Sequence, residues 1–180
     1  MIARLRGRIA GRAGTGLIVD VNGVGYLVHA TPSVQRLGDG EITVEIHTVV
    51  REDALQLFGF ATSDERQLFE LLLGVNGVGP KVALAILSGS TPAELRRAIA
   101  RDDVKRFQAI PGIGLKTAQR VVLELKAAVA EATAAGDELQ ARDALVELGW
   151  SILDAERVLA DVDPSLPIEE QVRAALRKAA

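Results

Sequence analysis

The sequence contains one nine-residue pattern twice, as VNGVGPKVA at residues 75–83 and as IPGIGLKTA at residues 110–118. The two copies align without a gap and share the form apolar-x-Gly-apolar-Gly-x-Lys-x-Ala. Residues with helical periodicity precede and follow each copy, so each copy is predicted to form a turn between two helices. An internal repeat of this kind indicates a duplicated supersecondary unit.

Each part of the repeat suits it to bind an anion through the backbone. The two glycines permit positive φ and let a ligand approach the main chain closely. The apolar residue between them is expected to anchor the turn in the core. The next helix starts just past the second glycine, so its free N–H groups point outward, and the lysine adds a full positive charge. Such a device binds phosphates and not bases, so two copies would hold successive phosphates along one duplex arm.

Other interpretations of these glycines fit less well or remain open. A dinucleotide-binding fingerprint needs a preceding strand and a third glycine, but residues 68–73 are helical and Val82 or Thr117 holds the third position. The run GLKT at residues 114–117 is one residue away from the Gly-Lys-Thr of a P-loop and lacks its strand-to-helix context. We therefore expect no ATPase in this chain. A tight structural turn between two helices stays open as the plain alternative.

The net charge of −3 averages over three unlike segments. Residues 1–63 carry six basic and six acidic side chains, residues 64–130 carry ten and seven, and residues 131–180 carry five and eleven. The acidity therefore belongs to the last segment, whereas the segment with the repeat is basic. With no cysteine and only two histidines, no disulfide framework, metal site or cofactor is expected.

The chain is also expected to be soluble and cytoplasmic. No apolar run approaches the ~18 residues of a membrane span. Arg4, Arg6 and Arg8 interrupt the start, which argues against a signal peptide.

The first sixty residues alternate with the period of β-strands. Asn22-Gly23 is a strong hairpin signal. Five strands are predicted, at residues 2–9, 17–21, 24–29, 42–50 and 55–60. They fit a small, partly open β-barrel of the OB type or a small sandwich, and the barrel is favoured because sixty residues are few for two packed sheets.

From Thr62 onward the period is helical, which makes the chain a multidomain β + α protein. Capping boxes are predicted at residues 62–65 and 91–94, and three further helices at residues 138–148, 152–160 and 168–178. The predicted parts are a barrel domain at 1–62, an all-α domain with both repeats at 63–128, a linker at 129–136 and a three-helix domain at 137–180.

The repeats are those of the helix-hairpin-helix motif, and the whole chain resembles the RuvA family of bacterial Holliday-junction-binding subunits. The stretches MIARLRG at 1–7, GVGY at 23–26, VVRED at 49–53 and LFGF at 57–60 carry the resemblance beside the repeats. It implies an OB-fold barrel, a double helix-hairpin-helix domain and a small C-terminal bundle. It further implies a homotetramer, or an octamer on DNA, that binds a four-way junction, with the RuvB ATPase as partner and the RuvC resolvase as a candidate partner.

The resemblance implies roles for particular residues. Those expected to bind DNA are Asn76, Gly77, Val78, Gly79, Lys81, Pro111, Gly112, Ile113, Gly114, Lys116, Thr117 and Arg120. Glu52 and Asp53 match an acidic pin at the junction centre, where carboxylates would repel phosphates, and Arg51 lies beside them; an ordinary solvated turn is the alternative. The C-terminal domain looks like a ubiquitin-associated-type bundle, which implies protein binding. The candidates for the motor contact are Leu145, Leu148, Trp150 and Leu159, although most are expected to be core.

Two rival functions remain. A helix-hairpin-helix DNA glycosylase or lyase would share the Pro-Gly-Ile-Gly loop, but it uses an aspartate downstream, and residues 115–136 contain none. We therefore expect no catalytic residue. A protein-interaction scaffold would use both glycine loops only as turns.

Overall fold

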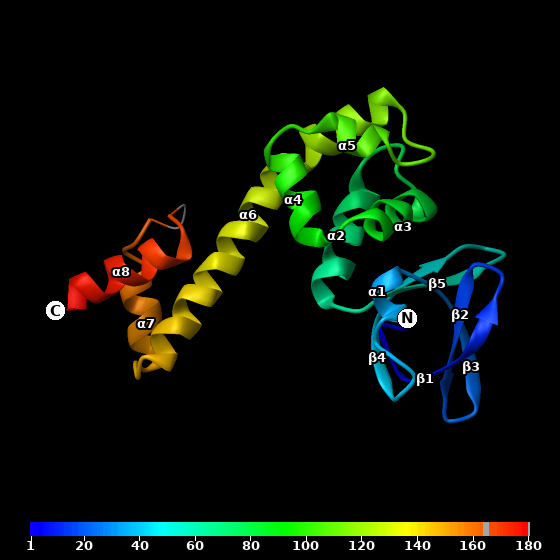
Figure 1. The fold of residues 1–180 in the computed structure, drawn as a ribbon, viewed down its shortest axis with the longest axis horizontal. Helices are drawn as coiled ribbons and strands as arrows, with labels where there is room; N and C mark the ends of the chain where they lie inside the picture. The colour runs from blue at the N-terminus through cyan, green and yellow to red at the C-terminus, as the bar shows by residue number, and fades with distance from the viewer. Residues whose placement is uncertain (164–165, 180) are drawn as a thin grey trace. The chain divides into compact units, whose positions relative to one another are not determined.

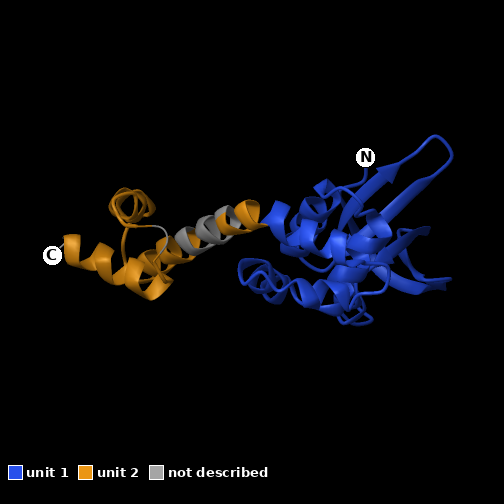
Figure 2. Cartoon of the chain, turned by 90° about the horizontal axis from the view of Figure 1, so that it is seen from above, with its two compact units in different colours: residues 1–125 blue, residues 126–180 orange. Residues whose placement is uncertain are grey.

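The structure is a computed structural model that describes residues 1–163 and 166–179, without the side chains of residues 131–138 and 179. The chain divides into two compact units, residues 1–125 and residues 126–180, which are coloured separately in Figure 2. Within the described part of the chain, no helix has both the length and the apolar character needed to cross a bilayer.

A closed five-stranded barrel forms the N-terminal part of the first unit (Figure 1). Its strands are β1 (Arg4–Ala13), β2 (Gly16–Val21), β3 (Val24–Ala30), β4 (Ile42–Val50) and β5 (Leu55–Phe60), in the spatial order β1-β2-β3-β5-β4. The five predicted strands are confirmed, but the expected partial opening is wrong, because residues 4–7 pair with residues 42–45 and close the barrel. A short helix, α1 (Pro32–Gln35), follows β3 and was not predicted.

Closure of the barrel depends on a glycine in β1. This strand pairs with β4 up to Gly7 and with β2 from Arg8 onward. A Cβ atom on Gly7 would lie 2.0 Å from the carbonyl oxygen of Asp20, so only glycine fits where the strand changes partners. The core inside is aliphatic and includes Leu5, Val19, Val28, Val44 and Leu57.

Four helices and the start of a fifth complete the first unit. They are α2 (Ser63–Gly74), α3 (Pro80–Gly89), α4 (Pro92–Ala100), α5 (Val104–Gln108) and α6 (Leu115–Glu147). Each packs through buried side chains, among them Leu68, Ile86, Leu95, Phe107 and Val121. The helices that flank the two repeats are therefore held in place by buried side chains.

The two predicted capping boxes have different outcomes. In α4 the box is complete, since Thr91 Oγ1 accepts from the N–H of Glu94 and the Glu94 carboxylate accepts from the N–H of Thr91. That hydrogen bond from the Thr91 backbone lowers the pKa of Glu94. In α2 only Thr62 caps, because the carboxylate of Glu65 turns toward the barrel instead.

The second unit contains the C-terminal part of α6, α7 (Ile152–Leu159) and α8 (Ile168–Ala179) around a small core that includes Ala141, Leu145, Ala155, Leu159 and Ala175. Gly149 has φ +97° and the N–H of Trp150 donates to the Leu145 carbonyl, which ends α6 in a Schellman motif. The bounds of α6 include residues 129–136, where a linker is predicted, and the start of the helix predicted at residues 138–148, although the side chains of residues 131–138 lie outside those described.

Candidate nucleic-acid interface

The two copies of the repeat fold into nearly identical turns. In the first, the N–H of Val78 donates to the Val75 carbonyl over 3.0 Å; in the second, the N–H of Ile113 donates to the Ile110 carbonyl over 3.1 Å. The glycine at the third position of each turn has positive φ, +90° at Gly77 and +89° at residue 112. Type II turns require glycine at this position, so the repeat encodes one turn twice.

The second glycine of each copy differs from the first in its backbone conformation. Gly79 has φ −90° and is the N-cap of α3, and Gly114 is also outside the positive-φ region, so neither uses the positive φ that glycine permits. A Cβ atom at either residue would meet no other atom within 4 Å. What glycine provides here is open space beside the start of a helix, where a ligand can reach the backbone.

The apolar residue between the glycines anchors the turn, as predicted. The exposed fractions of Val78 and Ile113 are 5% and 6%. Their N–H groups are used within the turn, so neither these side chains nor these amides face a ligand. At the start of α3 in the first copy, the amides of Gly79, Lys81 and Val82 have no partner among the described hydrogen bonds.

The second copy repeats this arrangement with one more donor. Gly114, Lys116 and Thr117 correspond to the three donors of the first copy, and the N–H of Leu115 is added where the first copy has Pro80. Four consecutive unpaired amides at a helix start are available as donors to an anion.

Lys81 and Lys116 stand in the first turns of α3 and α6, and both side chains are exposed. Neither lysine takes part in any of the ion pairs found among the described residues. Each copy therefore combines free backbone donors with an uncompensated cation. Groups of this kind are suited to contact phosphate oxygens without reading bases.

Arg120 connects the two copies. Its guanidinium donates from Nη1 to the carbonyl oxygen of Asn76 over 3.1 Å, and it also pairs with Glu124 on its own helix. The hydroxyl of Thr117 lies 3.8 Å from where a Cβ atom of Gly77 would be. The start of α6 thus packs against the first turn and fixes the spacing between the two anion sites. Asn76 and Pro111, which the sequence also singled out, are both exposed at the tips of the two turns.

The acidic residues lie at the tip of the β4–β5 hairpin. The N–H of Arg51 donates to the Ala54 carbonyl over 2.8 Å and closes the turn. Arg51, Glu52 and Asp53 are exposed, and no ion pair involves them in the described part of the chain. Two unpaired carboxylates therefore project from the barrel.

In the second unit the predicted motor-contact residues separate into core and surface. Leu145 and Leu159 are buried, so these two side chains are unavailable for a partner, whereas Trp150 packs against the same core and is only partly buried. Leu148 is 60% exposed. Two further apolar side chains at the start of α7 are on the surface as well: Leu153 is 78% exposed and Ile152 is also exposed. The three surface side chains flank the turn between α6 and α7.

Family models match three successive parts of the chain. The model described as "RuvA N terminal domain" covers residues 1–59, "SAM-like Helix-hairpin-helix tandem" covers residues 69–127, and "RuvA, C-terminal domain" covers residues 138–180. These ranges correspond to the barrel, the two repeats with their helices, and the three helices of the second unit.

Curated relatives match over nearly the full length. A protein of Rubrobacter xylanophilus named "Holliday junction branch migration complex subunit RuvA" is 46% identical over 192 aligned positions, which cover 99% of this chain and 97% of that protein. The proteins of the same name from Thermobifida fusca and Beutenbergia cavernae are 47% and 45% identical, over 99% and 100% of this chain and 96% and 98% of theirs. At this identity and coverage, the chain belongs to the RuvA family.

Proposed function

We propose that this chain is a non-catalytic DNA-binding subunit that recognises four-way junctions and recruits a RuvB-type ATPase for branch migration. The observation that carries the proposal is the duplicated anion site, with free amides and one unpaired lysine in each copy. The names of its relatives, which are subunits of a Holliday junction branch migration complex, support the same function. A competition between a four-way junction and a matched duplex tests it.

Binding would rest on phosphate contacts along the duplex arms. Two sites held at fixed spacing by Arg120 suit successive phosphates of one arm. A symmetric assembly of four copies would place one such pair on each arm, because a four-fold axis matches a four-armed DNA. The unpaired carboxylates of Glu52 and Asp53 would then repel phosphates at the centre and keep the crossing strands apart.

The two glycines of each turn give a test that separates folding from binding. Serine is a favourable N-cap residue, and there is open space for a side chain at position 79. The melting temperature of Gly79→Ser is therefore expected to stay constant or rise. The added hydroxyl accepts from the amides that a phosphate needs, so DNA affinity should fall by about tenfold, which is ~1.4 kcal/mol. Calorimetry and fluorescence anisotropy measure the two effects.

Gly77→Ser is the matched control. A side chain at φ +90° costs about 1–2 kcal/mol, so this variant should melt at a lower temperature than the parent. Unchanged DNA affinity in Gly79→Ser would contradict a phosphate site at the start of α3.

Recruitment of the ATPase is assigned to the exposed leucine and isoleucine side chains beside the α6–α7 turn. Leu153→Glu is expected to lower affinity for a RuvB-type ATPase by at least about tenfold, because a charge at the centre of an apolar contact must be desolvated. Its melting temperature and junction affinity should match the parent. Leu139→Glu, at another exposed leucine of the same unit, is the control, and equal losses in both variants would remove the assignment.

A further inference from the structure

Two four-residue stretches with the same capping pattern use their glutamates differently. Thr62-Ser63-Asp64-Glu65 starts α2 and Thr91-Pro92-Ala93-Glu94 starts α4. The carboxylate of Glu94 returns to its own cap, as the local pattern predicts. The carboxylate of Glu65 leaves its cap, so a stronger set of contacts must hold it elsewhere.

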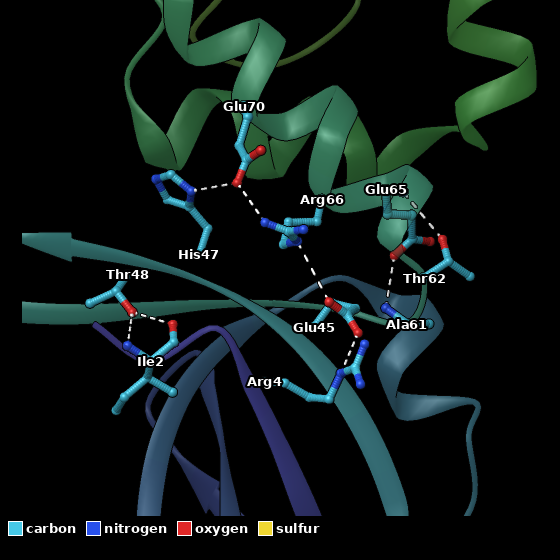
Figure 3. A network of polar contacts seen from close by, with 10 residues as sticks. All are labelled: Ile2, Arg4, Glu45, His47, Thr48, Ala61, Thr62, Glu65, Arg66 and Glu70. Atoms are coloured by element: carbon cyan, nitrogen blue, oxygen red, sulfur yellow. Dashed lines mark hydrogen bonds and ion pairs between the residues drawn. The ribbon is translucent and has the colours of Figure 1, made fainter. Parts of the chain in front are cut away.

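Those contacts join α2 to the barrel. One oxygen of Glu65 accepts from the Ser33 hydroxyl over 2.8 Å, from the Thr31 hydroxyl over 3.1 Å, and from the N–H of Ala61 over 3.1 Å. Glu65 is only 9% exposed and Thr31 is fully buried. A buried carboxylate is stable only with such donors, and removing it leaves them without a partner. Figure 3 shows Glu65 turned from Thr62 toward Ala61.

A second set of contacts involves the next residue of α2, Arg66, and Glu70, which lies one turn after Arg66. Arg66 Nε lies 3.6 Å from Oε2 of Glu45 on β4, and Arg66 Nη1 lies 3.0 Å from Oε1 of Glu70. The same oxygen of Glu70 lies 3.1 Å from Nδ1 of His47, also on β4 (Figure 3). Below them the ring of Phe69 packs against the rings of Phe58 and Phe60, at centroid distances of 5.3 and 4.9 Å. Helix α2 is thus fixed to the barrel along its first two turns.

The elements joined here lead to the two functional features. β4 continues from Glu45 and His47 to the acidic turn at residues 51–53, and α2 continues from Glu70 to the first anion site. The rotation of α2 against the barrel therefore sets the position of the carboxylates relative to the phosphate-binding amides.

We infer that Glu65 is a positioning residue that holds the acidic turn in register with the phosphate-binding turns, and so determines selectivity for junctions over plain duplex. The inference rests on the proposed function for the meaning of that selectivity. Duplex binding would use only the helical turns, and the hydrogen bonds of Glu65 to Thr31, Ser33 and Ala61 involve neither turn. Junction binding needs the turns and the carboxylates in one fixed arrangement.

Glu65→Ala is therefore expected to lower junction affinity by about tenfold while changing duplex affinity by less than about twofold. Glu94→Ala is the matched control, because it removes the glutamate at the same position of a capping pattern whose carboxylate accepts from its own N-cap, and its junction-to-duplex ratio should equal that of the parent. Ser33→Ala removes one donor and should shift the ratio in the same direction by less. Glu65→Gln keeps an acceptor for the N–H of Ala61, so it should retain part of the junction-to-duplex affinity ratio that Glu65→Ala loses.

A distance measurement tests the fixed arrangement without DNA. The chain has no cysteine, so Thr15→Cys on the barrel and Ala100→Cys on α4 give two unique sites for spin labels. Labelled protein diluted with unlabelled protein should show one narrow distance distribution, which Glu65→Ala broadens and Glu94→Ala leaves narrow. An equal ratio and an equally narrow distribution in Glu65→Ala and the parent would overturn the inference. A parent protein without junction preference would overturn the proposed function, and the distance distributions would then decide alone whether Glu65 fixes the two parts.

Discussion

Lys81→Glu together with Lys116→Glu is expected to lower affinity for four-way junction and plain duplex alike by at least about 100-fold. Each lysine stands beside free amides at the start of a helix. A hydrogen bond to a charged group contributes ~1.5–3 kcal/mol, so the loss of two corresponds to about 3–6 kcal/mol, or more than two decades in affinity. The new carboxylates also repel the phosphates that the two lysines would bind. Fluorescence anisotropy with labelled junction and duplex measures both affinities.

The salt dependence of the same binding identifies the lost contacts. The slope of log affinity against log salt should become shallower by about 0.9 for each phosphate contact removed. Arg36→Glu with Arg101→Glu changes the charge by the same amount at exposed sites outside the two turns, and it should weaken binding far less. Equal losses in both double variants would show that overall charge, and not the two sites, determines binding.

Glu52→Gln together with Asp53→Asn is expected to have the opposite effect on junction affinity. Removal of two unpaired carboxylates takes away repulsion from nearby phosphates, so junction affinity should be retained or rise by up to about tenfold. Branch migration driven by the partner ATPase should slow, because nothing then keeps the crossing strands apart at the centre. Strand-exchange kinetics with a fluorophore and quencher on opposite arms measure the rate.

The matched control for the acidic turn is Asp39→Asn with Glu41→Gln, which neutralises two exposed carboxylates elsewhere on the barrel. This control should leave both affinity and rate unchanged. A large loss of junction affinity in the Glu52 and Asp53 variant would contradict repulsion and would point to carboxylates that accept hydrogen bonds.

Local patterns in the sequence predicted most of the fold. Asn22-Gly23 forms the hairpin between β2 and β3, and Asn22 and Gly23 both adopt positive φ as such a turn requires. The capping pattern at residues 91–94 forms the complete box. These features succeed because the residues that decide them are within four positions of one another in the chain.

The features that sequence reasoning missed depend on contacts between distant residues. Glu65 follows the same local pattern as Glu94, but its carboxylate accepts hydrogen bonds from Thr31 and Ser33, which lie more than 30 positions earlier. Arg120 donates to a carbonyl 44 positions away. Closure of the barrel depends on pairing between residues 4–7 and residues 42–45. No periodicity within a short window contains such information.

The candidate site was predictable in kind but not in detail. The repeat predicted two anion sites and buried anchors between the glycines, and the anchors at Val78 and Ile113 are confirmed. It did not distinguish the first glycine, which needs positive φ, from the second, which leaves open space. In the second unit, the sequence did not separate buried Leu145 and Leu159 from exposed Leu148, because a small bundle offers too few residues for periodicity to distinguish a core face from a docking face.

Competition between a four-way junction and a duplex of the same total length and sequence tests the central claim most directly. The labelled junction is bound by the full chain at fixed salt, and either unlabelled DNA displaces it. If the duplicated anion sites and the acidic turn act together as proposed, the junction should displace the label at a concentration at least about tenfold below that of the duplex, a difference of ~1.4 kcal/mol or more. Displacement at equal concentrations, or no binding of either DNA, would contradict the account.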